Sequence, residues 1–299
     1  MEKRKITFSP PDITEREIAE VVDTLRSGWI TTGPKTKKFE NEIAEYCGTK
    51  KAVALNSATA AMELALRLFD IGEGDEVITS AYTYTASASV IYHCGAKIIL
   101  ADTKKGEFNI DPKEIEKLIT PRTKAIIPVD IAGLPVDYTE IFEVVEKKRN
   151  VFNAKKGTYQ EKLGRILVLA DSAHSFGSTY KGKKIGSVAD ITSFSFHAIK
   201  NLTTAEGGAL TWNLPENFDN EEIYKELMLL ALHGQNKDAL AKLKAGAWKY
   251  DIVMPGYKCN MTDIMSSIGL VQLQRYDGEI LKKKEELVSY YEKYLGDFT

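Results

Sequence analysis

The chain of 299 residues contains little cysteine, histidine or proline, with three, four and nine residues of each. Cys47, Cys94 and Cys259 are widely spaced and odd in number. They fit neither a disulfide framework nor the paired spacing of a zinc site, so we predict no metal site. Because a chain without a disulfide framework suits a reducing compartment, we expect a cytoplasmic protein.

An excess of basic charge is also missing. Lysine and arginine number 40 and aspartate and glutamate 42, which gives a net charge of −2 at pH 7. Nucleic acids and anionic membrane surfaces attract basic patches, so this balance predicts neither partner. The first residues lack the apolar core of a signal peptide, and no uncharged apolar run reaches the roughly 18 residues of a membrane-spanning helix. We therefore expect no membrane segment.

Short apolar runs alternate with helical patterns through most of the chain. Near-continuous apolar strands of this kind are typical of a parallel sheet that is covered on both faces. The sequence therefore predicts an α/β fold: a three-layer sandwich whose mostly parallel central sheet has helices on both faces. The predicted strands are 52–55, 76–79, 97–102, 125–129, 166–171, 191–196 and 209–212, and the clearest predicted helices are 12–27, 39–46, 60–68, 221–232, 262–273 and 277–294.

Ligands of such sheets bind outside the carboxyl ends of the strands. The residues at those ends are therefore candidates for a functional site. They are Ser57, Thr83 or Tyr84, Asp102, Asp130 and Asp171, followed by the segment 195–200.

Two of these candidates carry chemistry. Lys200 lies between an apolar segment and a turn rich in threonine and glycine. Partial burial lowers the pKa of a lysine, and the neutral amine can then form a Schiff base with a carbonyl group. Asp171 ends the most apolar strand, where a buried carboxylate needs a cationic partner such as a protonated ring nitrogen. A helix cap or a structural salt bridge is the alternative for Asp171.

A strand, a turn of small residues and a helix follow one another between residues 52 and 68. This arrangement points free backbone N–H groups at an anion, and the hydroxyls of Ser57 and Thr59 could add donors to a single phosphate. A plain helix N-cap explains the same residues equally well. The segment has neither the glycine fingerprint of a dinucleotide site nor that of a triphosphate site, which argues against a Rossmann oxidoreductase.

Two further segments leave a choice open. Tyr82 and Tyr84 stand at a strand-to-helix junction, where a ring could stack on a flat ligand or belong to the core. The loop 29–34 is rich in hydroxyl groups and is either a connector or a substrate contact.

Taken together, six segments resemble the DegT/DnrJ/EryC1/StrS family of nucleotide-sugar aminotransferases, which depend on pyridoxal 5′-phosphate (PLP) and have fold type I. Each segment alone is weak, but their common order and spacing are specific. They are GWITTGP (28–34), NSATAAMELAL (56–66), YTYTASA (82–88), LADSAHSFGSTYKGKKIGS (169–187), FSFHAIKNLTTAEGGAL (194–210) and GYKCNMTDIMSSIGLVQL (256–273).

The resemblance implies a role for each matching residue. Lys200 would form the internal aldimine and carry the proton, Asp171 would pair with the pyridinium nitrogen, and His174 would lie near the ring oxygen. Tyr84 would stack on the ring. The phosphate would be held by Ser57, Ala58, Thr59 and Ser195, with Lys258 or Asn260 reaching it across a homodimer interface, and Thr31, Thr32 and Gly33 would line the sugar side.

The implied reaction moves an amino group from glutamate through PLP and pyridoxamine phosphate (PMP) to a keto group of a nucleotide-linked deoxysugar, in ping-pong order. Polysaccharide biosynthesis is the expected context. A sugar dehydratase on the same fold is a weaker alternative, since those relatives replace the lysine with histidine and Lys200 is present. A non-catalytic regulator is the other alternative, although it would not need both Lys200 and Asp171.

Some features depart from the family pattern. Ala58 stands where many members have glycine and Lys258 where many have asparagine. The segment 147–164 is longer and more basic than usual, and we interpret it as a surface insertion without an assigned role. We expect residues 1–215 to form the large PLP-binding domain and 216–299 a helical linker with the start of a small C-terminal domain, which the family normally continues beyond this point.

Overall fold

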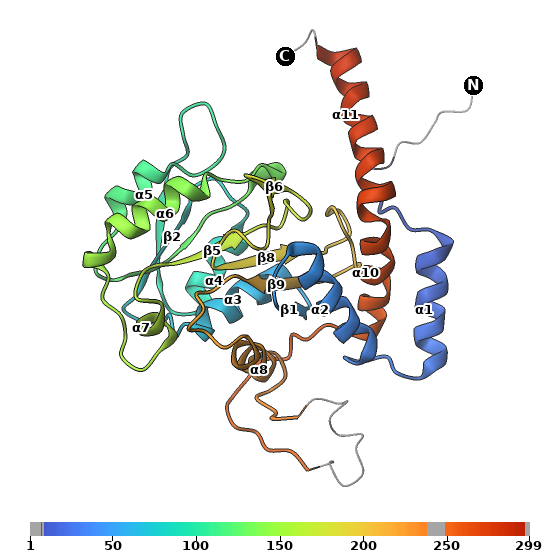
Figure 1. The fold of residues 1–299 in the computed structure, drawn as a ribbon, viewed down its shortest axis with the longest axis horizontal. Coiled ribbons are helices and arrows are strands. Elements are labelled where there is room, and N and C mark those ends of the chain that lie inside the picture. Colours follow the sequence, from blue (N-terminus) through green and yellow to red (C-terminus); the bar gives the residue numbers. More distant parts are fainter. Residues whose placement is uncertain (1–6, 8, 238–248, 297–299) are drawn as a thin grey trace.

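The computed structural model describes residues 7, 9–237 and 249–296, and a seven-stranded sheet lies at its centre (Figure 1). The order of strands across this sheet is β1-β9-β8-β5-β4-β2-β3. The strands are β1 (Ala52–Leu55), β2 (Glu76–Ser80), β3 (Lys97–Ala101), β4 (Thr123–Ile127), β5 (Leu167–Asp171), β8 (Ile191–Ser195) and β9 (Gly208–Trp212), while β6 (Thr179–Tyr180) and β7 (Lys183–Lys184) form a separate hairpin.

Parallel pairing dominates the central sheet. Strands β3, β2, β4, β5 and β8 are parallel to one another. Strand β9 runs antiparallel to both β8 and β1. The predicted α/β fold with a mostly parallel sheet is therefore confirmed, and five strands direct their carboxyl ends to the same edge.

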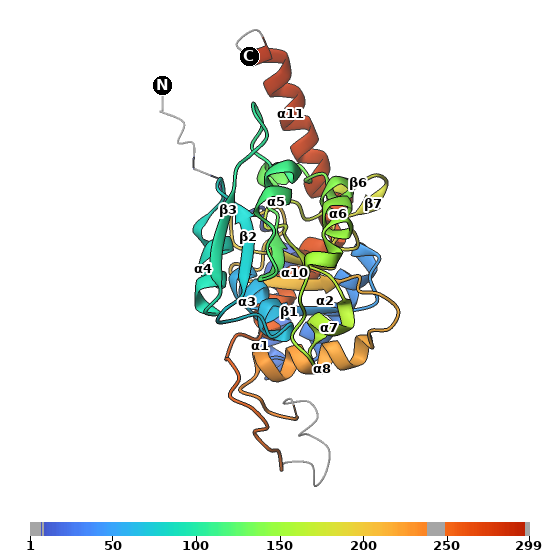
Figure 2. The same ribbon diagram turned by 90° about the vertical axis from the view of Figure 1, so that its left-hand side faces the viewer.

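Helices cover both faces of the sheet, so the three layers are also confirmed (Figure 2). Successive strand residues face opposite layers. Ala54 of β1 packs in the core with Phe39, whereas Leu55 packs in the other core with Leu64. The first core includes residues of α2 (Pro34–Cys47), α5 (Pro112–Leu118), α6 (Tyr138–Lys147) and α10 (Asp263–Arg275), and the second includes residues of α3 (Ala58–Leu68), α4 (Thr85–His93), α7 (Tyr159–Leu163) and α8 (Asn220–Ala231).

Capping contacts explain where the first two helices begin. Helix α1 (Glu15–Ser27) follows Thr14, which forms a capping box with Glu17, and ends before Gly28 at a φ of 75°. Helix α2 begins at Pro34, five residues before the predicted start at Phe39. The side chain of Asp263 accepts hydrogen bonds from the backbone of the first turn of α2. This carboxylate lies more than 200 residues away in sequence, so Pro34 in the first turn is the local signal for the true start of α2.

The C-terminal part of the described chain is helical. Helices α8 and α10 bury apolar residues in the two cores. A π-helical turn, η3 (Tyr276–Leu281), joins α10 to α11 (Lys282–Leu295), which has no buried residue. Of the predicted segment 216–299, residues 238–248 and 297–299 lie outside the described residues, and the domain boundary at residue 215 stays a prediction. None of the helices that the structure describes is both long and apolar enough to cross a bilayer.

The expected insertion at 147–164 connects α6 to β5. It contains a short 3₁₀ turn, η2 (Arg149–Val151), and α7. Its last turn packs against the body of the protein, because Leu163 is buried and the amide of Gln160 donates to the Phe69 carbonyl at 2.9 Å. The interpretation of this segment as an insertion stays a prediction.

A buried ion pair fixes α1 against α10. Arg275 donates to Glu17, and both side chains are only 1% exposed. The guanidinium also contacts Asp12 at 2.8 Å and Glu279 at 3.1 Å. Burial by itself raises the pKa of Glu17, but the hydrogen bonds from Thr14 and Arg275 outweigh it and leave the pKa below its ordinary value.

Substituting Glu17→Gln should destabilise the protein by about 2–3 kcal/mol at pH 7, because Arg275 loses its one fully buried anion but keeps two others. A folded-state pKa below the ordinary value of 4.5 means that the charge of Glu17 stabilises the fold above that pH. The deficit of the variant should therefore shrink as the pH falls below about 4.5. Urea unfolding across pH would measure it, with the exposed Glu279→Gln as a control of smaller effect. A deficit that is the same at every pH would contradict the expectation.

Candidate active site

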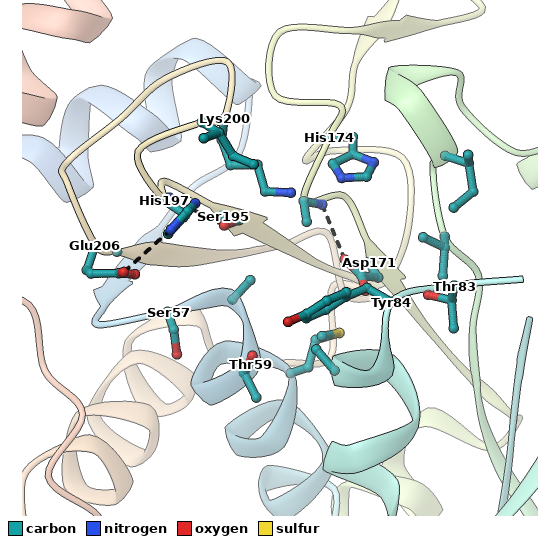
Figure 3. A pocket seen from close by; sticks show the side chains of 18 residues that line it. Ser57, Thr59, Thr83, Tyr84, Asp171, His174, Ser195, His197, Lys200 and Glu206 are labelled. Atoms are coloured by element: carbon teal, nitrogen blue, oxygen red, sulfur yellow. Dashed lines mark hydrogen bonds and ion pairs between the residues drawn. The ribbon is translucent and has the colours of Figure 1, made fainter. Parts of the chain in front are cut away.

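A cavity of about 560 Å³ opens at the carboxyl edge of the parallel strands (Figure 3). Segments far apart in the sequence line it. Its walls come from the turn before α3, the start of α4, the ends of β4 and β5, and the loop between β8 and β9. The lining residues are Ser57, Ala58, Thr59, Met62, Thr83, Tyr84, Ala86, Val129, Ile131, Asp171, Ala173, His174, Ser195, His197, Ile199, Lys200, Glu206 and Gly207.

Lys200 stands in the turn that follows β8. Its backbone N–H donates to the His197 carbonyl at 2.9 Å, which holds the turn closed. Its amine extends across the cavity in the direction of His174 (Figure 3). Burial lowers the pKa of Lys200, and the negative charge of Asp171 opposes part of that decrease. The amine is therefore more nucleophilic at neutral pH than that of an ordinary surface lysine.

Asp171 ends β5 at the floor of the cavity and is 4% exposed. Its carboxylate accepts a hydrogen bond of 2.6 Å from Ser87 and one of 3.2 Å from the backbone of Ala173. Burial raises the pKa of Asp171, although these donors counteract the rise. Among the described residues, no ion pair joins Asp171 to His174 or Lys200, so the structural salt bridge considered above involves neither of these side chains.

His174 lies three residues beyond Asp171, on the turn after β5. The backbone N–H of Ala132 donates to its Nδ1 at 3.3 Å. Because a backbone N–H can only donate, Nδ1 must accept, and the proton of the neutral ring lies on Nε2. Burial, and secondly the charge of Lys200, lower the pKa of His174. The lowered pKa favours the neutral ring, in which Nε2–H is the donor.

The opposite wall is the N-terminus of α3. Ser57 is the N-cap, since its hydroxyl accepts from the Ala60 N–H at 3.1 Å. The N-cap alternative therefore holds, yet Ser57, Ala58 and Thr59 also line the cavity, together with Ser195. Gly208 makes room for this turn, because a side chain there would lie 2.4 Å from the Ala58 nitrogen. Hydroxyls and a helix N-terminus suit a phosphate group.

The two tyrosines differ in position. Tyr84 precedes α4, is 78% exposed and borders the cavity beside Asp171 (Figure 3). Tyr82 instead packs against Phe108, with ring centroids 5.2 Å apart, and does not line the cavity. Neither ring belongs to the core, so the core alternative is wrong for both.

The remaining predicted site residues lie outside the cavity lining and contact one another. Asn260 donates to Thr32, whose hydroxyl donates in turn to the Met261 carbonyl at 2.5 Å. Lys258 donates to Asn260 at 2.5 Å, and Gly33 donates to Asp263. The Thr31 carbonyl accepts from the Asp263 N–H at 3.0 Å. These contacts join the loop 31–33 to the segment 258–263, and the sugar and cross-subunit roles of these residues stay predictions.

The segment 258–263 nevertheless lies beside the turn before α3, which carries Ser57. The N–H of Asn56 donates to the Cys259 carbonyl at 2.8 Å. The position of Lys258 and Asn260 next to residue 56 is therefore set within one chain.

Three contacts at or beside the cavity were not predicted from the sequence. Ser87 links Asp171 to Thr83, whose hydroxyl lies 2.7 Å from that of Ser87. Asn201 ties the Lys200 turn to the His174 carbonyl at 3.0 Å. Nε2 of His197 lies 3.6 Å from a carboxylate oxygen of Glu206 at the rim (Figure 3). All of these residues lie inside the six matching segments, and that location is the signal in the sequence that could have suggested them.

Comparisons with known proteins agree with this geometry. Residues 11–299 match the model of the DegT/DnrJ/EryC1/StrS aminotransferase family. The spore coat polysaccharide biosynthesis protein SpsC of Bacillus subtilis is 42% identical over 288 residues, which cover 96% of this chain and 68% of SpsC. An uncharacterized protein of Methanocaldococcus jannaschii is 46% identical over 280 residues, or 93% of this chain and 66% of that protein. The chain thus spans about two thirds of the length of these relatives.

Solved structures give the same result. A Streptococcus pneumoniae protein provisionally named a sugar aminotransferase was solved in a PMP form that is 57% identical, with a TM-score of 0.92 over 97% of this chain and 72% of that chain. A PLP form of that protein is also known. Helicobacter pylori PseC, an aminotransferase in the biosynthesis of pseudoaminic acid, is 30% identical with a TM-score of 0.81 over 96% of this chain and 70% of its own. These forms agree with the predicted cofactor.

The contact between Ser87 and Asp171 can be tested by substitution. Ser87→Ala should raise the pKa of Asp171 further, because a donor to its charged form is lost. A hydrogen bond to a charged group contributes about 1.5 kcal/mol, so PLP should bind roughly tenfold more weakly. Titration with PLP followed by absorbance would measure this, with Ser89→Ala on the same helix as the control. Equal affinities for the two variants would contradict the assigned contact.

The lowered pKa of Lys200 predicts a pH dependence of its reactivity. In protein free of PLP, acetylation of Lys200 should have its midpoint below the ordinary value of 10.5. Asp171→Asn should move that midpoint lower still, because the negative charge that favours the ammonium form is removed. Mass spectrometry of peptides labelled across pH would measure both. Burial also lowers the pKa of Lys258, which should not respond to Asp171→Asn and serves as the internal control. A midpoint that rises in the variant would overturn the expectation.

Proposed function

Because this chain belongs to the DegT/DnrJ/EryC1/StrS aminotransferase family, we propose that it is a PLP-dependent sugar aminotransferase. The observation that carries the proposal is the meeting of Lys200, Asp171 and His174 in one cavity, opposite a helix N-terminus. PLP requires three attachments, which are a reactive amine, a buried anion and a turn that can bind its phosphate group.

The residues of the cavity fit the cofactor in size and in charge. PLP supplies an electron sink that makes the transfer of amino groups possible. Lys200 would hold it covalently, and Asp171 would face its ring nitrogen, whose positive charge offsets the cost of the buried carboxylate. Ser57, Ala58, Thr59 and Ser195 would hold the phosphate, and Tyr84 would cover one face of the ring.

Proton movement would then fall to Lys200. Its lowered pKa leaves a share of the amine neutral near pH 7, so the group can accept a proton and return it within the cavity. His174 would donate a hydrogen bond from Nε2–H to the ring oxygen and keep its proton, because Nδ1 already accepts from the Ala132 N–H. The mouth of the cavity, where His197 and Glu206 lie, would receive the substrates.

Glutamate is the proposed amino donor, and the acceptor is a keto group of a nucleotide-linked deoxysugar. In the balanced reaction, glutamate leaves as 2-oxoglutarate and the keto sugar becomes an amino sugar, in ping-pong order. The name of SpsC, a polysaccharide biosynthesis protein, and that of PseC support a sugar acceptor. Thr31, Thr32 and Gly33 would contact the sugar, and Lys258 or Asn260 the phosphate of a partner subunit in a homodimer.

A cytoplasmic location is part of the proposal. The three cysteines are free and buried, as expected in a reducing compartment. The dehydratase and the non-catalytic regulator remain the alternatives that an experiment must separate from the aminotransferase.

Absorption spectra of the protein with PLP, before and after glutamate, would test the proposal. We expect a PLP band that glutamate converts to the PMP form and that a nucleotide-linked keto sugar restores. Lys200→Ala should abolish the covalent band, whereas the exposed Lys183→Ala should leave it unchanged.

Each failure has its own meaning. A protein that binds no PLP would overturn the catalytic proposal and favour the regulator. A band that glutamate leaves unchanged would reject glutamate as donor and favour the dehydratase or another amino donor. Restoration of the band by a free keto sugar alone would reject the nucleotide-linked acceptor.

A further inference from the structure

A second buried carboxylate lies directly behind the cavity. Asp130 follows β4, is 0% exposed and is not part of the cavity lining. It accepts hydrogen bonds from the Val136 N–H at 3.0 Å, the Tyr138 hydroxyl at 3.0 Å, and the hydroxyls of Ser172 and Ser175, both at 2.8 Å. Burial raises the pKa of Asp130, and these four donors counteract the rise.

Two of the donors belong to the turn that carries His174. Ser172 and Ser175 flank this histidine in sequence, and both hydroxyls converge on Oδ2 of Asp130. The turn is therefore pinned on either side of the imidazole by a single carboxylate oxygen. Neither serine lines the cavity, so their contact with Asp130 acts through the backbone.

Asp130 also begins the short turn that faces His174 from the other side. This turn is η1 (Ile131–Gly133), and the Asp130 carbonyl accepts from the Gly133 N–H at 3.2 Å. Ala132 adopts a left-handed φ of 53°, a conformation that costs free energy for a residue other than glycine and persists only where its surroundings impose it. This conformation accompanies the hydrogen bond from the Ala132 N–H to Nδ1 of His174.

We propose that Asp130 is a positioning residue that fixes the tautomer of His174. It holds the turn 172–175 and the turn 131–133 against each other, so that the Ala132 N–H meets Nδ1 and the ring proton stays on Nε2. The charged groups that face His174 across the cavity are Lys200 and Asp171. The backbones of Asp130 and Asp171 are also paired, since the Asp130 N–H donates to the Asp171 carbonyl at 3.1 Å.

This inference rests on the proposed function only for its consequence, which is a donor directed at the cofactor. The tautomer itself can be measured without PLP. Protein labelled with ¹⁵N at its four histidines would give long-range ¹⁵N–¹H spectra, in which His174→Gln identifies the signals of His174. In the unaltered protein we expect the Nε2–H tautomer to dominate.

The hydrogen bonds from Ser172 and Ser175 to Asp130 are called the clamp below. Two variants disrupt the clamp from opposite sides. Asp130→Asn weakens acceptance by the carboxylate, and Ser172→Ala with Ser175→Ala removes two donors while Asp130 stays. Each should raise the ratio of Nδ1–H to Nε2–H tautomer about tenfold, as expected for the loss of one net hydrogen bond. Asp190→Asn is the matched control, because Asp190 is also buried but binds Arg165 and the Val168 N–H at the opposite ends of the strands.

The results separate positioning from general stability. A changed tautomer in both clamp variants, with Asp190→Asn unchanged, would support the proposal even if PLP failed to bind. An unchanged tautomer in Asp130→Asn, with a loss of thermal stability similar to that of Asp190→Asn, would overturn it. Should Asp130→Asn fail to fold, the double serine variant decides alone, since it retains the acid.

Discussion

The carboxylate of Asp171, enclosed at the end of a central strand, is the constraint on which the rest of the site depends. An isolated buried anion is strongly destabilising unless hydrogen bonds and a cation compensate it. Ser87 and the Ala173 backbone supply part of that compensation. A positive group within the cavity would supply further compensation, as the charge of Lys200 already does in part. This demand, rather than the lysine alone, makes the cavity suited to a ring with a protonated nitrogen.

The sheet topology places a carboxylate and a helix N-terminus on opposite sides of the cavity. Parallel strands bring Asp171 and the Lys200 turn to one edge, and α3 directs its N-terminus at the same space from the opposite wall. The carboxylate at the floor and the helix N-terminus at the opposite wall would suit the proposed ligand, which is flat and has a cationic ring and an anionic tail. Gly208 allows this approach, because a side chain there would collide with the turn before α3.

Behind the cavity wall, a second set of polar residues supports the first. The carboxylate of Asp130 collects donors from both sides of the His174 turn, and Asn201 links that turn to the segment of Lys200. Polar networks of this kind keep their geometry only when their members are satisfied. Catalytic groups whose orientation depends on such contacts are preorganised before any ligand enters. Most of these supporting residues are serines or amides, whose local sequence resembles that of any loop.

The sequence by itself determined the α/β class, the strands and the edge where the site lies. The alternation of buried strands and helices is visible in the sequence, because the spacing of apolar residues differs between the two kinds of element. It also identified Lys200, Asp171 and the turn at Ser57 as candidates. Only the tertiary structure decided which neighbours orient them. Ser87, Asp130 and Asp263 form hydrogen bonds to Asp171, Ser172 and Thr36, which lie 84, 42 and 227 positions away. Such contacts depend on how the layers pack, and no local pattern encodes them.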